Sequence, residues 1–247
     1  MTDPGSRIAR YRAARERVLE RIAAAAGRAG RDPTAVTLVA VSKTVPAEAV
    51  RDAVAAGLTV LGENRVQEAA GKVPDVPGAR WHLVGPLQSN KARRAVELFD
   101  VIESVDSVEL AGRLDRIVSE VRPGSRYPIL LQVNVDRDPA KAGFAPEALG
   151  DAVERIAELD ALEIAGLMTI GRLVERPEEA RASFRSLTET AARLREGGRG
   201  LGGALSMGMT DDYEIAVEEG ATIVRIGRAL FGERDHDHEH RHGPEGH

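Results

Sequence analysis

One lysine, Lys43, stands directly after a β-rich segment and is the first candidate for covalent chemistry. The segment over 38–42 is short and mostly apolar, which predicts a buried strand. A neutral lysine amine condenses with an aldehyde when burial or a nearby cation lowers its pKa. An ordinary surface lysine at a strand–loop junction is the alternative interpretation.

A second chemical feature lies near the C-terminal end of the chain. In VRIGRALFG a β-branched run passes through Gly227 into a helical pattern, and in LSMGMTDD another β run ends at Ser206, Met207 and Gly208. Such junctions turn backbone N–H groups and a helix dipole toward anions, and glycine permits close approach. The hydroxyl of Ser206 and the N–H groups of Gly208, Gly227 and Arg228 therefore predict a phosphate cradle. Two ordinary turns are the alternative.

A lysine amine and a phosphate cradle would together hold an aldehyde that carries a phosphate, and pyridoxal phosphate is such a molecule. Arg225 shares one side of its strand with Gly227. If Arg225 faces the ring nitrogen, it donates a hydrogen bond and keeps that nitrogen unprotonated. An unprotonated ring is a weaker electron sink, which favours restrained chemistry. A salt-bridged arginine at the rim is the alternative.

Four further polar residues follow or lie within predicted strands. Asn64 is placed to bind the ring or its hydroxyl, whereas Glu63 equally suits the acidic first turn of a helix. His82 is the only histidine outside the C-terminal tail, and we interpret it as a buried, hydrogen-bonded core residue. Asn134 is expected to end the fifth strand.

The elements that position these residues alternate along the whole chain. Eight strands are predicted, over 38–42, 59–61, 81–84, 101–104, 129–135, 164–169, 205–207 and 222–226. Helical patterns separate them, which indicates an α/β fold in the form of a single (β/α)₈ barrel of the TIM type. In such barrels the reactive groups lie at the carboxyl ends of the strands. A doubly wound open sheet is the structural alternative.

Amphipathic spacing predicts helices over 6–26, 106–121, 177–195 and 211–220. The first of these would cover the bottom of the barrel or join its outer ring. Asp106 and Asp211 are expected to cap the second and fourth.

The composition excludes several classes of protein. The net charge of −5 argues against nonspecific nucleic-acid binding, and the absence of cysteine excludes disulfides and thiol catalysis. No apolar run approaches the roughly 20 residues of a membrane span, so we expect a cytoplasmic protein. We expect the barrel to occupy 1–233 and the His-rich segment over 234–247 to be disordered. No metal site is predicted beyond weak binding by that segment.

The motifs VAVSKT, LGENRVQE, WHLVGPLQSNK, GLMTIG and LSMGMTDDYEIAVEEGATIVRIGRALFG, in this order, resemble the pyridoxal phosphate homeostasis protein family. The resemblance implies a barrel like the N-terminal domain of bacterial alanine racemase. It also implies pyridoxal 5'-phosphate held on Lys43 as an internal aldimine. By the same resemblance, Ser206, Gly208, Gly227 and Arg228 hold the phosphate, and Met207 is a wall of that loop. Arg225 would face the ring nitrogen and Asn64 the ring or its hydroxyl.

Two functions follow from different classes of protein. The first is a carrier that buffers pyridoxal phosphate in the cell and passes it to apoenzymes that require it. The second is an amino-acid racemase, which needs bases on both faces of a carbanion. Alanine racemase takes one base from a tyrosine of a second domain, and we expect no second domain here. We therefore expect a monomeric, non-catalytic carrier.

Overall fold

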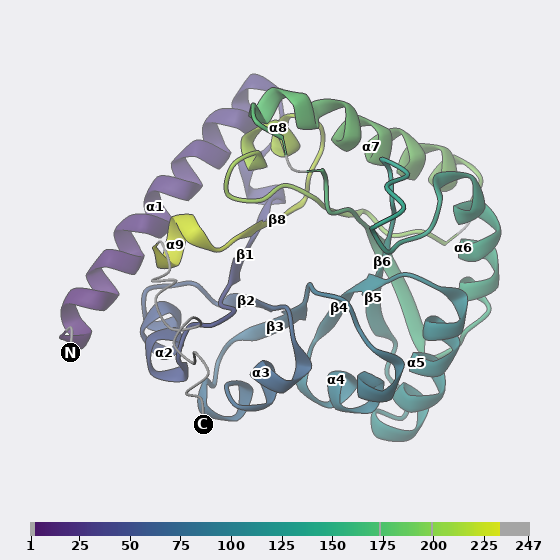
Figure 1. Cartoon of the computed structure of the whole chain (residues 1–247), viewed down its shortest axis with the longest axis horizontal. Helices are drawn as coiled ribbons and strands as arrows, with labels where there is room; N and C mark the ends of the chain where they lie inside the picture. The colour runs from purple at the N-terminus through teal and green to yellow at the C-terminus, as the bar shows by residue number, and fades with distance from the viewer. Residues whose placement is uncertain (1–2, 173, 199, 233–247) are drawn as a thin grey trace, which may run out of the picture.

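Within the described residues, eight parallel strands close into a barrel in chain order, and β1 pairs with β8 (Figure 1). The computed structural model describes residues 3–172, 174–198 and 200–232. The strands are β1 (Thr37–Val41), β2 (Val60–Glu63), β3 (Arg80–Leu83), β4 (Val101–Val105), β5 (Tyr127–Gln132), β6 (Leu162–Met168), β7 (Ala204–Ser206) and β8 (Ile223–Ile226). The predicted barrel is confirmed, and the open-sheet alternative is wrong.

Successive residues of each strand face opposite sides of the barrel wall. Val39, Val101 and Met168 belong to a small apolar cluster inside the barrel. Their neighbours Ala40 and Ile102 belong to a larger cluster between the strands and the helices. Because both sides of the wall are buried, a polar side chain on either side must find its partner inside the protein.

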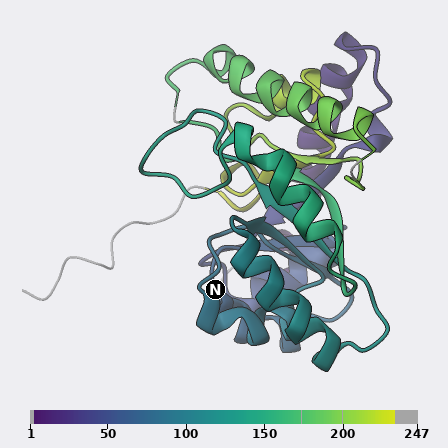
Figure 2. The same cartoon turned by 90° about the vertical axis from the view of Figure 1, so that its right-hand side faces the viewer.

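Helices form the outer layer (Figure 2). The α-helices are α1 (Pro4–Arg28), α2 (Ala47–Ala55), α3 (Val66–Ala70), α4 (Ala92–Leu98), α5 (Val108–Val121), α6 (Leu149–Ala157), α7 (Arg181–Glu196), α8 (Tyr213–Glu218) and α9 (Arg228–Phe231). Short 3₁₀ turns are η1 (Pro33–Ala35), η2 (Val73–Asp75), η3 (Ser89–Lys91), η4 (Pro146–Ala148) and η5 (Pro177–Ala180).

The long first helix, α1, joins the outer ring rather than the bottom of the barrel. It lies against α2, α8 and α9, and its predicted apolar stripe buries Tyr11, Val18 and Ile22 (Figure 1). The ring of Tyr11 meets that of Phe231 edge-on at 5.4 Å between centroids. This contact ties the N-terminal helix to the last described element.

Two of the predicted helix starts are wrong. Ser107, not Asp106, caps α5, because its hydroxyl accepts the N–H of Leu110 at 3.2 Å. The cap position of α8 is Asp212 rather than Asp211, and its carboxylate accepts the N–H of Met209 at 2.7 Å. The predicted helix over 177–195 begins as the 3₁₀ turn η5 and becomes α-helical only at α7.

The fifth strand ends earlier than predicted. β5 stops at Gln132, and Asn134 lies in the loop beyond it. Asn134 donates to the carbonyl of Asp138 at 2.8 Å and accepts the N–H of Asp138 at 3.0 Å. The side chain therefore closes a local turn, because asparagine readily bonds nearby backbone groups.

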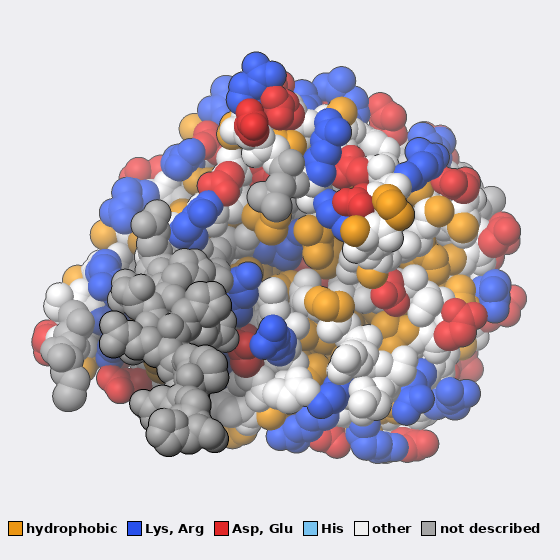
Figure 3. Space-filling model, viewed as in Figure 1, with side chains coloured by type: hydrophobic (Ala, Val, Ile, Leu, Met, Phe, Trp, Pro, Cys, Tyr) orange, Lys and Arg blue, Asp and Glu red, His pale blue; other side chains and the backbone are white. Residues whose placement is uncertain are grey.

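The predicted end of the barrel at 233 and the predicted tail over 234–247 lie outside the described residues. None of the described helices combines the length and the apolar character that crossing a membrane requires. Charges of both signs are interspersed around the face seen in Figure 3, as the sequence pattern suggests.

Candidate functional site

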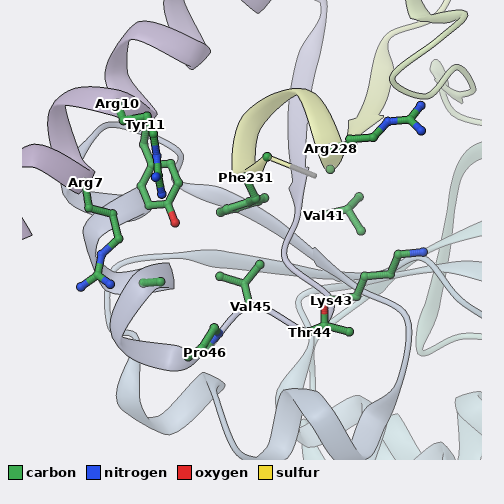
Figure 4. A pocket seen from close by; sticks show the side chains of 13 residues that line it. Arg7, Arg10, Tyr11, Val41, Lys43, Thr44, Val45, Pro46, Arg228 and Phe231 are labelled. Atoms are coloured by element: carbon green, nitrogen blue, oxygen red, sulfur yellow. The ribbon is translucent and has the colours of Figure 1, made fainter. Parts of the chain in front are cut away.

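Lys43 lies just beyond the end of β1. Because side chains alternate along a strand, Lys43 is on the same side of the chain as the residues of β1 that face into the barrel. Val39 and Val41 lie on this face and contact the interior cluster. The Lys43 side chain is partly buried, and Figure 4 shows it extending away from Arg7 and Tyr11. The structure thus places the predicted lysine at the carboxyl end of the barrel, where barrel enzymes hold their reactive groups.

A pocket of about 410 Å³ adjoins Lys43 (Figure 4). Its walls come from α1, from the turn after β1 and from the junction of β8 with α9. Small-molecule sites commonly measure roughly 300–1,000 Å³. Three of the predicted residues, Lys43, Gly227 and Arg228, line this pocket, although Lys43 lies far from the other two in the sequence.

The other five predicted residues do not line this pocket, although all lie at or near the carboxyl ends of neighbouring strands: Asn64, Ser206, Met207, Gly208 and Arg225. The partly buried Asn64 lies directly after β2. Its backbone packs against Gly85, where an added Cβ would lie 2.3 Å from the Asn64 carbonyl oxygen. Only glycine at position 85 allows that approach.

Arg225 lies inside the barrel and is 5% exposed. Its guanidinium donates to the hydroxyl of Ser206 at 2.6 Å and to the carbonyl of Thr169 at 2.8 Å. Nη1 also lies 4.0 Å from a carboxylate oxygen of Glu103. These contacts hold the guanidinium inside the barrel, near the carboxyl ends of β6 and β7. The acidic partner of the alternative interpretation is present, but the side chain is buried in the barrel rather than exposed at its rim.

Glu103 is the centre of this interior network and is fully buried. One carboxylate oxygen bonds Nδ1 of His82 at 2.6 Å, and the other accepts the Ser206 hydroxyl at 2.5 Å. Burial opposes the ionisation of Glu103, but the bond with His82 and the charge of Arg225 hold its pKa below the usual 4.5. His82 is thus the hydrogen-bonded core histidine that the sequence analysis favours.

Ser206 uses its hydroxyl in this network, since it donates to Glu103 and accepts from Arg225. A phosphate oxygen bound by that hydroxyl would have to replace Glu103, because the hydroxyl has a single hydrogen to donate. Met207 is fully buried in the apolar cluster between strands and helices. Only its backbone is therefore placed to contact a ligand at the strand ends.

The two predicted glycine turns differ in their geometry. Gly208 has a φ of +88°, and an added Cβ would lie 2.5 Å from Cβ of Ala216, so the position requires glycine. Gly227 stands at the start of α9, beside the pocket. The next residue, Arg228, is exposed and pairs with Asp211 at 2.5 Å. A cation is therefore present at this turn together with the first N–H groups of α9.

Two buried charged residues, Glu103 and Lys72, are not predicted from the sequence, and Glu63 does not act as the helix-start acid that its position suggests. Glu63 instead ends β2 and is fully buried beside Lys72. A usable signal exists for Glu103, because VIESV is a β-branched, mostly apolar strand in which a buried charge requires a partner. Lys72 follows a short helix in a polar stretch, and nothing in that pattern indicates burial.

The model of the alanine racemase N-terminal domain matches residues 15–235. A pyridoxal phosphate homeostasis protein of Pseudomonas aeruginosa is 47% identical over 225 residues, covering 89% of this chain and 94% of that protein. The chain belongs to the pyridoxal phosphate homeostasis protein family. The Escherichia coli member is 39% identical over 233 residues, covering 89% of this chain and 94% of its own.

Solved structures agree with this membership. PipY of Synechococcus elongatus, determined with pyridoxal phosphate bound, is 45% identical and superposes with a TM-score of 0.75. The match covers 87% of this chain and all of PipY, at 100%. Alanine racemase of Clostridium difficile is only 15% identical, with a TM-score of 0.66 over 89% of this chain and 56% of its own. That second likeness establishes the barrel fold alone.

Proposed function

We propose that this chain binds pyridoxal 5'-phosphate at Lys43 and acts as a carrier that maintains the supply of the cofactor in the cell. The observation that carries the proposal is the meeting of Lys43, Gly227 and Arg228 on one pocket at the carboxyl ends of the strands. Membership in a family whose PipY member was solved with this cofactor supports the same assignment.

The groups around the strand ends suit such a ligand. Lys43 brings an amine, Arg228 a cation beside glycine backbone, and Arg225 a buried guanidinium. When bound, pyridoxal phosphate would supply an aldehyde, and Lys43 would hold the cofactor through its neutral amine.

The remaining residues would bind and orient. Gly208, Gly227 and Arg228 would hold the phosphate, with Ser206 joining by exchanging a partner. Arg225 would donate to the ring nitrogen and keep it unprotonated, since arginine has no acceptor. Asn64 would bind the ring or its hydroxyl. Met207 would contribute backbone only, because its side chain is fully buried.

The same residues favour a carrier over a racemase. Racemisation requires a second base opposite the lysine. The hydroxyl of Tyr127 donates a hydrogen bond to the carbonyl of Phe99 at 2.8 Å, and Tyr213 is buried. Tyr11 lines the pocket, yet Figure 4 shows Lys43 extending away from it. We infer further that the chain works as a cytoplasmic monomer and passes the cofactor to apoenzymes.

The test is reduction of the cofactor-loaded protein with borohydride, followed by peptide mass spectrometry. Four lysines compete for the label, at positions 43, 72, 91 and 141. We expect the label on Lys43, and loss of the visible absorbance in Lys43→Ala. A label confined to another lysine would overturn the assignment.

The non-catalytic role is tested separately by incubating the loaded protein with L-alanine and other L-amino acids. We expect no formation of D-amino acids above that of free cofactor. Turnover near 1 s⁻¹, at the low end of ordinary enzymes, would establish an enzyme instead. In that case Tyr11→Phe would show whether the pocket tyrosine serves as the second base.

A further inference from the structure

The turn that carries Lys43 is held in an unfavourable conformation. Thr44 has a φ of +65°, in the left-handed region that β-branched residues rarely adopt. Backbone strain of this kind persists only where surrounding contacts enforce it, and it concentrates at functional sites. The contacts that enforce it here can be identified.

One set of contacts fixes the peptide unit before Lys43. The carbonyl oxygen of Ser42 accepts from Nζ of Lys72 at 2.8 Å and from the N–H of Val45 at 3.0 Å. Lys72 also donates to Glu63 at 2.7 Å, and the same Glu63 oxygen accepts the Ser42 hydroxyl at 2.7 Å. Residue 42 is thus held at both its side chain and its carbonyl, on the helix-facing side of the wall.

Another contact fixes the peptide unit after Lys43. The N–H of Thr44 donates to Oε2 of Glu68 at 3.1 Å. Glu68 lies in α3, and its carboxylate is 3.9 Å from Nζ of Lys72. Two side chains one helical turn apart therefore hold the backbone on both sides of the lysine.

Burying the charges of Glu63 and Lys72 costs free energy, so stability alone does not explain this arrangement. Lys72 is 8% exposed and Glu63 is fully buried, and the second oxygen of Glu63 is buried with no hydrogen-bond partner within the described residues. A buried ion pair often stabilises a protein less than apolar side chains of the same volume would. Its placement against the strained turn indicates a geometric role.

We propose that Ser42, Glu63, Glu68 and Lys72 form a brace that positions Lys43 for attack on the aldehyde of the cofactor. The four are positioning residues, since the brace acts on the backbone that carries the amine. The proposal rests on the proposed function at Lys43. It assigns to the buried Lys72 a second role beside its ion pair with Glu63.

The experiment mixes the apoprotein with pyridoxal phosphate and follows covalent capture in a stopped-flow instrument, with total bound cofactor measured by equilibrium dialysis. We expect Lys72→Met to slow capture about tenfold or more, with less effect on total binding. Lys72→Arg, which keeps donors for both Ser42 and Glu63, should restore most of the rate.

Arg31→Met is the matched control. Arg31 also donates to backbone carbonyls, those of Val217, Gly220 and Ala221, but it lies before β1, at the opposite end of the barrel. We expect capture by this variant to stay within about twofold of the wild-type rate, even if its melting temperature falls as far as that of Lys72→Met. Equal slowing in both variants would mean that lost stability, not positioning, controls the rate.

A second variant keeps the proposal testable if Lys72→Met does not fold. Glu68→Ala removes the acceptor of the Thr44 N–H, and because the Glu68 side chain is only partly buried, we expect this variant to fold. We expect slower capture, because the peptide unit after Lys43 is no longer held. An unchanged rate in Glu68→Ala would refute the brace. Failure of the wild-type protein to capture the cofactor would instead refute the proposed function.

Discussion

Two fully buried glutamates on opposite sides of the barrel wall are used in different ways. Glu103 faces inward from β4, and both its oxygens are bonded, to His82 and to Ser206. Glu63 faces outward from β2, and one of its oxygens has no partner among the described residues. Burial therefore raises the pKa of Glu63 despite its bond to Lys72, whereas the pKa of Glu103 is lowered.

The difference separates two ways of building a site. The inner glutamate organises side chains, chiefly the guanidinium of Arg225 that would meet the ring. The outer glutamate, Glu63, helps to fix the backbone of the turn that carries Lys43, through its contacts with Ser42 and Lys72. A fully satisfied network is rigid and stabilising, whereas a partly satisfied one contributes geometry at an energetic cost.

The largest effect should come from breaking the outer pair. Lys72→Met leaves the buried carboxylate of Glu63 uncompensated, and we expect the free energy of unfolding to fall by about 3–5 kcal/mol. Urea denaturation measures it. The double variant Glu63→Gln with Lys72→Met should recover part of the loss, and no recovery would show that the charge of Glu63 is not the cause.

Removing the charge of the inner glutamate should lower the free energy of unfolding by less, provided that the hydrogen bonds to His82 and Ser206 are kept. Glu103→Gln keeps an amide beside His82 and Ser206 but removes the charge facing Arg225. We expect a loss of about 1.5–3 kcal/mol, the usual range for a hydrogen bond to a charged group. The same denaturation assay applies. A loss below 0.5 kcal/mol would mean that Arg225 needs no anionic partner.

The two glutamates should also respond to pH in opposite directions. Because its pKa is raised above 4.5, Glu63 contributes stability that is fully present below that value and is lost as the pH rises through the raised pKa. Glu103 contributes stability that is present above 4.5 and is lost as the pH falls through its lowered pKa.

Unfolding free energies of the wild type, Glu63→Gln and Glu103→Gln, measured from about pH 3 to 7, test this prediction. Relative to wild type, Glu63→Gln should gain stability with rising pH, and Glu103→Gln should lose it. Parallel curves for the two variants would contradict the comparison between the buried sites.

The smallest effect is expected at the exposed ion pair between Arg228 and Asp211, whose side chains are 51% and 74% exposed. Asp211→Asn should change the free energy of unfolding by less than about 0.5 kcal/mol, because water and salt screen such pairs. Cofactor affinity should hold or rise, since Arg228 is released toward the phosphate. A weaker affinity would show that Asp211 is needed to position Arg228.

The sequence by itself determines the number and order of the strands, which favours a barrel, while the pairing of β1 with β8 decides between the barrel and an open sheet. Strand alternation and the βα order place Lys43, Asn64, Ser206 and Arg225 at one end, because every parallel strand ends there. Helix caps were harder to predict, since Asp106 and Ser107 are equally suitable residue types and only the backbone decides between them.

Only the tertiary structure decides which side chains meet. The contact of Arg225 with Ser206 spans 19 residues, and that of Ser206 with Glu103 spans 103. No local pattern encodes such pairs. The burial of Lys72 against Ser42 likewise depends on how α3 packs against the wall. The sequence period shows on which face of a strand or helix a residue lies. Which residues contact one another across the barrel depends on its closure, because closure brings the ends of distant strands together.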